Sequence, residues 1–312
     1  SDNNEAKKDY ILRGNSVIMS PYIDKNKNLI FLSNSNIIMK IDDQNNLIWF
    51  NDTFKFHHTF NVNEETNTAW TAGYKTNINN IGRISVREDY RDDTLVKIDL
   101  NDGKVLESIS LTEIFIKQNL HNHLFIGRGD LYMSDPLHIN DVEEIQFDSN
   151  YFKKGHLFVS LAHQNMILMI DPIEKKILWK INDGLFHQHD VDIISKNAIS
   201  IFNNNRIIPD NDISFKNNEI NIFNFEDMKM SSPYDEILKK NDVRTINQGL
   251  QEFTKFGILV EEQNYGRIIF FDDKDVIFEY INKGSNNKVY QLHWSRIIKD
   301  KIKIRKIRES FK

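Results

Sequence analysis

Apolar residues occur along this chain in short runs of about four to eight, separated by clusters of Asn, Asp and Gly. Clear examples are "NLIFLSN" (28–34), "HLFVSLA" (156–162) and "RIIFFDD" (267–273). Short apolar runs between turn residues are typical of β-strands. Only "LTEIFIKQNL" (111–120) and "PYDEILKKN" (233–241) follow a helical period. The pattern therefore predicts an all-β protein.

One hairpin pattern repeats along the chain. Its copies are "MKIDDQNNLIWF" (39–50), "VKIDLNDGKVLESI" (96–109), "LMIDPIEKKILWKI" (168–181) and "IFFDDKDVIFEYI" (269–281). In each copy a strand ends in an apolar residue and Asp, a polar turn follows, and the next strand carries a large apolar residue. The wide last interval has room for a degenerate copy near 218–227.

A hairpin that recurs about every 50 residues in an all-β chain is typical of a β-propeller, in which each repeat is one blade. For 312 residues this predicts a single domain of six four-stranded antiparallel blades around a central channel. Five or seven blades stay open, because an insertion at 112–137 inflates the length. We assign residues 16–312 to the propeller and residues 1–15 to a polar segment that helps to close the last blade.

The C-terminal run "KDKIKIRKIRESFK" (299–312) alternates basic and apolar residues. We interpret it as an exposed edge strand that is protected by its charges, in preference to a binding patch.

Composition narrows the functional classes. The chain has no cysteine, which excludes a thiol nucleophile, a cysteine-ligated zinc and disulfides. A net charge of −5 does not favour binding to nucleic acid, which is itself negatively charged. No apolar stretch approaches the roughly 18 residues of a membrane span, so we expect no membrane insertion. The polar start "SDNNEAKKDY" resembles what remains after removal of an upstream signal or anchor, and we expect an exported, periplasmic protein.

Histidines stand where innermost strands are expected. They lie in "FHHTFNV" (56–62), "DPLHINDVEEI" (135–145) and "FHQHDVDII" (186–194), each of which precedes a hairpin repeat. Innermost strands line the channel of a propeller, so these imidazoles should converge on one axis. A structural role, catalysis and a zinc site are the alternatives. No supporting carboxylate stands out beside each histidine, so we assign no metal and no cofactor. The acidic run "DVEEI" (141–145) is interpreted as a solvated turn.

Several of these segments together resemble the bacterial arylsulfotransferase family. The family pattern runs His-x-Asn, Ser-x-Arg-His, Ile-Asp and Trp, Gln-His, then Phe-(Asp/Asn)-Asn. This chain has "HIN" (138–140), "SLAH" (160–163), "QH" (188–189) and "FNN" (202–204) in that order. The tail "INQGLQEF" (246–253) with "VYQLHWSRI" (289–297) is also similar to a pattern found in the family. The resemblance covers nearly the whole chain from about residue 16.

This resemblance implies a six-bladed propeller that moves a sulfuryl group from an aryl sulfate to a phenol through a sulfated histidine. Both partners are small molecules, and neither a cofactor nor nucleic acid is involved. Carried over by motif, the nucleophile is His189, and the other catalytic positions are His138, His58 and His57. Substrate-binding positions are Asn140, His163, Arg206, Arg296, Gln188 and His187. A neutral imidazole is a competent nucleophile near pH 7.

The chain departs from the family at one position that matters for the chemistry. Ala162 stands where the family has the arginine that holds the sulfuryl oxygens. Loss of such a cation costs on the order of 3 kcal/mol of transition-state stabilisation. Replacement by His163, Arg206 or Arg296 would restore it.

Other functional hypotheses stay open beside the enzyme. Without a replacement cation, the chain would be a decayed enzyme, a propeller that binds an anionic or aromatic ligand without turnover. A propeller that binds a metal through its histidines is the third alternative. A quinone-dependent dehydrogenase is disfavoured, because those propellers carry many docking tryptophans and this chain has 4. The motif also leaves open whether His187 or His189 faces the channel.

Overall fold

A computed structural model of the chain describes residues 17–33, 36–78, 80–81, 84–125, 133–208, 213–214, 216–299 and 301–310. The predicted contribution of residues 1–15 to closure lies outside the described residues.

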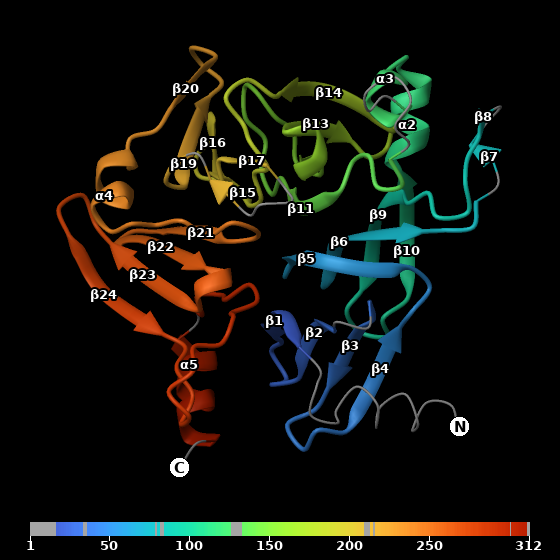
Figure 1. Ribbon diagram of the computed structural model, residues 1–312. Coiled ribbons are helices and arrows are strands. Elements are labelled where there is room, and N and C mark those ends of the chain that lie inside the picture. Colours follow the sequence, from blue (N-terminus) through green and yellow to red (C-terminus); the bar gives the residue numbers. More distant parts are fainter. Residues whose placement is uncertain are drawn as a thin grey trace.

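Five four-stranded antiparallel sheets form the molecule, and they are arranged around a common axis (Figure 1). The first contains β1 (Ile18–Ile23), β2 (Leu29–Ser33), β3 (Ile38–Ile41) and β4 (Leu47–Asn51). The second contains β5 (Lys55–Asn63), β6 (Thr68–Lys75), β9 (Asp92–Asp99) and β10 (Val105–Ser110), and the short hairpin β7 (Asn80–Ile81) and β8 (Ile84–Ser85) is inserted into it.

The remaining three sheets follow in chain order. The third contains β11 (Ile139–Glu144), β12 (Leu157–Leu161), β13 (Met166–Asp171) and β14 (Lys176–Ile181). The fourth contains β15 (Val191–Ile193), β16 (Ala198–Asn203), β19 (Glu219–Asn224) and β20 (Lys229–Ser231), with β17 (Arg206–Ile208) and β18 (Ile213–Ser214) inserted. The fifth contains β21 (Leu250–Thr254), β22 (Gly257–Glu262), β23 (Arg267–Phe271) and β24 (Val276–Ile281).

The prediction of an all-β propeller with four-stranded antiparallel blades is confirmed. Each repeated hairpin of the sequence forms the outer two strands of a blade, and the degenerate copy near 218–227 is β19 and β20. The number of blades differs from the prediction, because the described residues form five such sheets and not six. Inserted hairpins and helices lengthen the second and fourth blades, so the chain length overstates the number of blades.

An extended segment, residues 290–299, lies between the first and fifth sheets, and we call it the closing segment. Its His293 carbonyl accepts the Ser20 N–H of β1 at 3.2 Å. On its other side, Glu261 of β22 accepts the N–H groups of Trp294 and Ser295 at 2.9 and 2.7 Å. The closing segment thus joins the first blade to the last without forming a sheet of its own.

A backbone feature recurs at six matched positions around the axis. Ser20, His58, His138, His187, Gln248 and Trp294 have φ values of 48°, 60°, 57°, 56°, 60° and 67°. Five of them stand at the start of, or within, the innermost segment of a blade, and Trp294 is in the closing segment. Left-handed backbone is uncommon for residues other than glycine. Its recurrence places the closing segment in the same relation to the axis as the five innermost strands.

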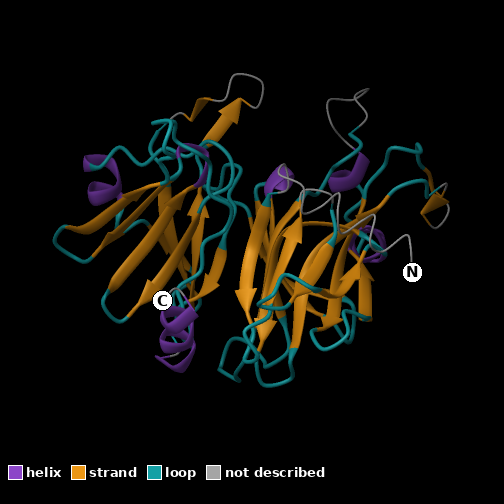
Figure 2. Ribbon diagram, turned by 90° about the horizontal axis from the view of Figure 1, so that it is seen from below, coloured by secondary structure: helices purple, strands orange, loops and turns teal. Residues whose placement is uncertain are grey.

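Short helices lie at the ends of the strands (Figure 2). Those of the body are α2 (Leu111–Lys117), α3 (Asn122–Phe125) and α4 (Asp235–Lys240), and α2 and α4 fall on the two predicted helical stretches. The prediction of an edge strand at 299–312 is wrong, because Lys301–Ser310 form the helix α5. Lysine, arginine and glutamate are strong helix formers, and this segment contains neither glycine nor proline. None of the helices in the described ranges has the length and apolar character that a membrane span requires.

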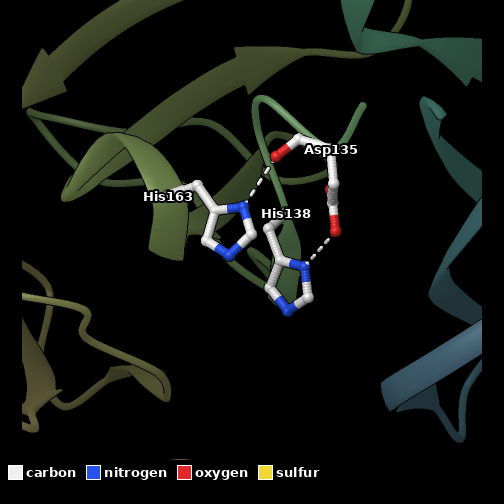
Figure 3. A group of neighbouring side chains, drawn as sticks. All are labelled: Asp135, His138 and His163. Carbon is white, nitrogen blue, oxygen red and sulfur yellow. Dashed lines mark hydrogen bonds and ion pairs between the residues drawn. The ribbon is translucent and has the colours of Figure 1, made fainter. Parts of the chain in front are cut away.

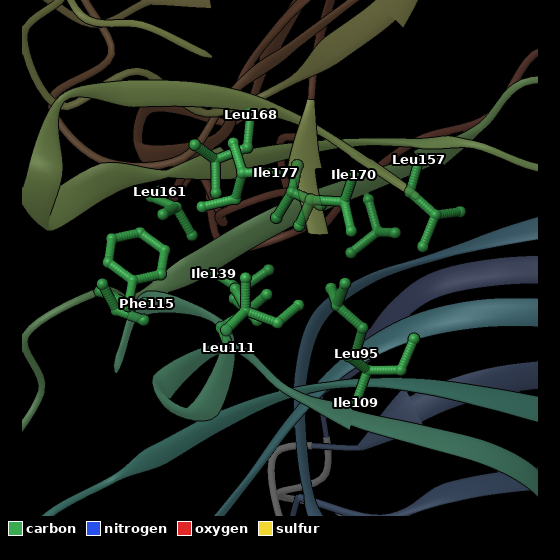
Figure 4. Packing of buried hydrophobic residues seen from close by; sticks show 14 of the residues in the cluster. Leu95, Ile109, Leu111, Phe115, Ile139, Leu157, Leu161, Leu168, Ile170 and Ile177 are labelled. Atoms are coloured by element: carbon green, nitrogen blue, oxygen red, sulfur yellow. The ribbon is translucent and has the colours of Figure 1, made fainter. Parts of the chain in front are cut away.

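Apolar side chains from neighbouring blades and from α2 form the largest buried cluster (Figure 4). Leu95 and Ile109 of the second blade meet Ile139 and Leu157 of the third, and Phe115 of α2 covers them. All five side chains are at most 1% exposed. This packing fixes the second and third blades relative to each other, and both carry histidines.

Candidate active site

Six histidines of the second, third and fourth blades gather in one cluster. Five of their rings form a closed circuit, in which the centroids of successive rings lie 4.3–6.2 Å apart. The order around the circuit is His58, His138, His163, His187, His189 and back to His58. His57 adjoins His58 at 4.9 Å. The predicted convergence of His57, His58, His138 and His189 is therefore observed, and His163 and His187 belong to the same cluster.

Irregular backbone aims these side chains at the axis. The pairing of β5 with β6 shifts register between His57 and Phe60, and the pairing of β11 with β12 shifts just after His138. Such bulges change the direction of a side chain relative to regular alternation. Together with the left-handed φ of His58, His138 and His187, they bring imidazoles from three blades to one point.

His189 is almost completely buried, at 2% exposure, and both of its nitrogens are engaged. Its Nδ1 lies 2.7 Å from Asn204 Oδ1, and its Nε2 accepts the backbone N–H of Gln248 at 3.0 Å. Asn204 is itself held, because its Nδ2 donates to the Gln248 carbonyl at 2.6 Å. These partners define the neutral tautomer with the proton on Nδ1. Burial, together with the nearby His138, lowers the pKa of His189 to about 3.

His138 and His163 are oriented by a single residue, Asp135 (Figure 3). His138 Nδ1 lies 2.7 Å from Asp135 Oδ2, and His163 Nδ1 lies 2.6 Å from the Asp135 backbone carbonyl. Arg91 also donates to Asp135 Oδ2, at 2.8 Å. Although burial opposes its ionisation, the hydrogen bond from His138 and the surrounding charges lower the pKa of Asp135 to about 2. Asp135 is thus an ionised acceptor beside two imidazoles, the supporting carboxylate that the sequence did not reveal.

The remaining imidazoles are also neutral at pH 7. His57 Nδ1 and His58 Nδ1 lie 2.6 Å apart, so one of them donates to the other. Burial and the neighbouring His138 lower the pKa of His57 to about 3 and that of His58 well below its usual value. Burial and the neighbouring His189 lower the pKa of His187 to about 2. These three rings and that of His189 therefore present imidazole lone pairs and not positive charge.

Two guanidinium groups, those of Arg206 and Arg91, lie beside the cluster. Ala162, at 1% exposure, is buried immediately before His163 and carries no charge to the site. Arg206 Nη1 lies 3.4 Å from His187 Nε2 and donates to Asn247 Oδ1. Arg91 reaches the other side of the cluster through Asp135 and lies over the ring of Tyr74, 4.8 Å from its centroid.

Asn140 and Gln188 are fully buried, so neither side chain reaches the mouth of the channel. Gln188 Nε2 donates to the carbonyls of Leu161 and Met166, both at 3.1 Å. Asn140 Nδ2 donates to the Gln188 carbonyl at 2.9 Å. These two predicted substrate-binding residues instead hold the segment that carries His187 and His189 against the third blade.

Arg296 does not join the histidines. Its Nη2 donates to the Phe60 carbonyl, and its guanidinium lies over the Phe60 ring, 5.2 Å from the centroid. It lines a separate cavity of about 630 Å³, whose lining contains no histidine. Acidic side chains dominate this cavity, namely those of Glu64, Glu143, Asp190, Asp192 and Glu252.

Three acidic residues of this cavity lie on innermost strands, namely Glu143 on β11, Asp192 on β15 and Glu252 on β21. The interpretation of 141–145 as a solvated turn is wrong, because Asp141–Glu144 are part of β11. Asp141 Oδ2 accepts the N–H of Val191 in the next blade, and Asp190 Oδ2 accepts that of Gln251 in the blade after, both at 2.9 Å. The acids therefore join blade to blade around the axis, which a motif-based analysis of single segments cannot show.

Asp135, Arg91, Asn204 and Gln248 are site residues that the sequence analysis did not assign. Asp135 and Asn204 stand inside the quoted segments "DPLHINDVEEI" (135–145) and "FNN" (202–204), so their spacing from the histidines was a usable signal. Arg91 stands in a charge-rich stretch without a recognisable pattern. Gln248 stands in "INQGLQEF" (246–253), but it contributes only its backbone, so its role could not be assigned from its side chain.

Comparison with known proteins adds a family and a fold. A sequence profile described as "Arylsulfotransferase (ASST)" matches residues 11–283. A search of curated protein sequences gives no match. A protein of unknown function from Bacteroides caccae has a similar structure, with a TM-score of 0.53 and 12% identity over 86% of this chain and 82% of that one. The WD40 domain of Neurospora crassa Pan2 matches with a TM-score of 0.45 and 14% identity, over 88% of this chain and 65% of the Pan2 chain. At such identities only the propeller fold is shared.

Proposed function

The chain belongs to the arylsulfotransferase family, and we propose that it transfers a sulfuryl group from an aryl sulfate to a phenol through His189. The observation that carries this proposal is the buried His189 within a cluster of imidazoles, with a pKa lowered to about 3 that leaves its ring unprotonated at pH 7. Nucleophilic catalysis by histidine needs an unprotonated nitrogen, and burial lowers the pKa values of His189 and of its neighbours His58 and His187. The family supplies the reaction class, and the cluster supplies side chains suited to it.

In the first step, the Nε2 lone pair of His189 attacks the sulfur of the donor. The S–O bond to the aryl group breaks, its electron pair leaves on the phenolate oxygen, and an N–S bond forms. In the second step, the acceptor phenol oxygen attacks the same sulfur, and the N–S bond breaks to return the lone pair to Nε2. The proton that the acceptor loses balances the proton that the leaving phenolate gains.

Asn204 and Gln248 set up this step from two sides. Asn204 holds the proton on Nδ1, so the lone pair lies on Nε2. The Gln248 N–H, which donates to Nε2 at 3.0 Å, has to release that nitrogen when it attacks. The released amide then stands beside the transferred group, where a fixed backbone donor stabilises charge on sulfuryl oxygens. Arg206, at the rim next to His187, is a cation available to the same oxygens.

The test is the intact mass of the protein after brief exposure to excess 4-nitrophenyl sulfate, with nitrophenolate release followed in parallel. We expect a gain of one sulfuryl group, about 80 Da, in the parent protein. His189→Ala should gain nothing, whereas His121→Ala, which alters a histidine outside the cluster, should behave as the parent.

A sulfurylated His189→Ala variant would overturn the assignment of the nucleophile and direct the search to His187. If neither nitrophenolate nor an adduct forms with this or other aryl sulfates, the chain is a non-catalytic propeller that binds anionic or aromatic ligands.

A further inference from the structure

His138 and His163 share a geometry that nucleophilic catalysis by His189 does not use. Their rings are stacked, with centroids 4.3 Å apart and planes 21° from parallel, and their Nε2 atoms point the same way (Figure 3). Each Nδ1 faces an oxygen that can only accept, the Asp135 carboxylate for His138 and the Asp135 carbonyl for His163. Each ring therefore carries a proton on Nδ1, and in the neutral imidazole this leaves the lone pair on Nε2.

His58 lies beside them, and its Nε2 carries the lone pair in the tautomer in which His58 donates to His57. Its Nδ1 is engaged with His57 Nδ1 at 2.6 Å, and its ring centroid lies 4.9 Å from that of His138. Within the described part of the chain, the Nε2 atoms of His58, His138 and His163 have no hydrogen-bond partner.

We propose that His138 and His163 bind a divalent transition-metal ion through their Nε2 atoms, with His58 as a third imidazole ligand and Asp135 as the outer-sphere carboxylate. Asp135, His138 and His163 already offer ligand atoms that all lie within 4.8 Å of one another. A ligating histidine almost always donates its other ring N–H to a carboxylate or a carbonyl, and both kinds of acceptor are present here. Imidazole ligands with one open position favour zinc.

The electrostatics of the cluster agree with this assignment. Arg91 is the nearest competing cation, and Asp135 Oδ2 keeps it paired at 2.8 Å. His163 is exposed, so an ion has access from solvent.

The position of this site suggests a role in sulfuryl transfer. That role rests on the proposed function, whereas the binding of a metal ion does not. Ala162, where the family pattern has arginine, immediately precedes His163. A metal ion on His163 would place positive charge next to the missing guanidinium, where it could receive the sulfuryl oxygens as a Lewis acid.

The binding test uses the full chain without a polyhistidine tag. After treatment with EDTA and dialysis, the protein is titrated with Co²⁺, and the visible d–d absorption of a tetrahedral site is recorded before displacement by Zn²⁺. We expect one ion per chain. His163→Ala should weaken binding at least a hundredfold, and Asp135→Asn about ten- to a hundredfold. His121→Ala is the matched control and should bind as the parent does.

Circular dichroism and cooperative thermal unfolding establish that each variant is folded, and the exposed position of His163 makes its removal well tolerated. Absence of stoichiometric binding by the parent, or equal binding by a folded His163→Ala variant, would overturn the site.

A separate assay addresses the role in sulfuryl transfer. EDTA should abolish transfer by the parent, Zn²⁺ should restore it, and Ala162→Arg should be active without metal. If Co²⁺ binds but EDTA leaves transfer unchanged, the site stands and the Lewis-acid role is wrong. If Co²⁺ binds and no condition gives transfer, the proposed function is wrong and the metal site still stands.

Discussion

Asp192 lies on β15 and lines the acidic cavity, and its carboxyl group gives a direct test of the electrostatics of the channel. Burial, reinforced by the nearby Asp141 and Glu252, raises its pKa from 3.8 to about 8. The folded protein therefore holds Asp192 protonated at pH 7, although Lys299 partly opposes the shift. Replacement by asparagine keeps the shape and removes the ionisation.

The sign and the size of the effect follow from proton linkage. Between pH 3.8 and pH 8 the folded state binds a proton that the unfolded state has lost. The stabilisation is fully present below pH 3.8 and is lost as the pH rises through 8. From pH 5 to pH 8 the loss is about 4 kcal/mol, at roughly 1.4 kcal/mol per pH unit. The buried histidines have the opposite effect on stability. Because their pKa values are lowered, their contribution to the free energy of unfolding is fully present above pH 6.5 and is lost as the pH falls below that value. That contribution is equal in parent and variant.

The assay is urea unfolding of the parent and Asp192→Asn at pH 5 and pH 8.5. We expect the difference in free energy of unfolding between Asp192→Asn and the parent to favour the variant by about 4 kcal/mol more at pH 8.5 than at pH 5. Asp43→Asn, in an exposed turn, is the control and should show no such dependence. Equal differences between variant and parent at the two pH values would refute the reasoning, because they would mean that the folded state does not hold this carboxyl protonated.

Three further predictions concern the site and its support. Asn204→Ala removes the acceptor that fixes the tautomer of His189, and we expect sulfuryl transfer by the folded variant to fall about ten- to a hundredfold in steady-state assays. Urea unfolding should also show a loss of about 1–3 kcal/mol, because the buried Thr245 and Gln248 carbonyls lose their donor. An unchanged rate would contradict the orienting role. Glu261→Gln replaces one of the two oxygens that accept N–H groups of the closing segment, and urea unfolding should show a loss of about 1–3 kcal/mol. No loss would mean that the closing segment is held by its other contacts. Gly249→Ala puts a Cβ 2.5 Å from a phenylalanine ring at a residue with φ of +107°, and the same measurement should show a loss of about 2 kcal/mol or more; parent-like stability would disprove the strain.

Local patterns in the sequence were sufficient for the strands, the outer hairpins and the approximate place of the histidines. Apolar runs between turn residues specify strands, because alternating burial and turn chemistry act over a few residues. The hairpin around Asp171, which became β13 and β14, is one such case. The segments with His57, His138 and His189 were predicted to be innermost strands because each of them precedes a repeated hairpin.

Relations between distant residues were decided only by the tertiary structure. Strand alternation cannot place His138 or His187, because a left-handed φ and a bulge change the direction of the side chains. The contact of Asp135 with both His138 and His163 depends on how a loop meets the end of β12. Glu261 shows the same limit, since its partners in the closing segment lie 33 and 34 residues further along the chain. Side chains so far apart in sequence meet only when the packing of whole blades fixes their backbones, and no local pattern encodes that orientation.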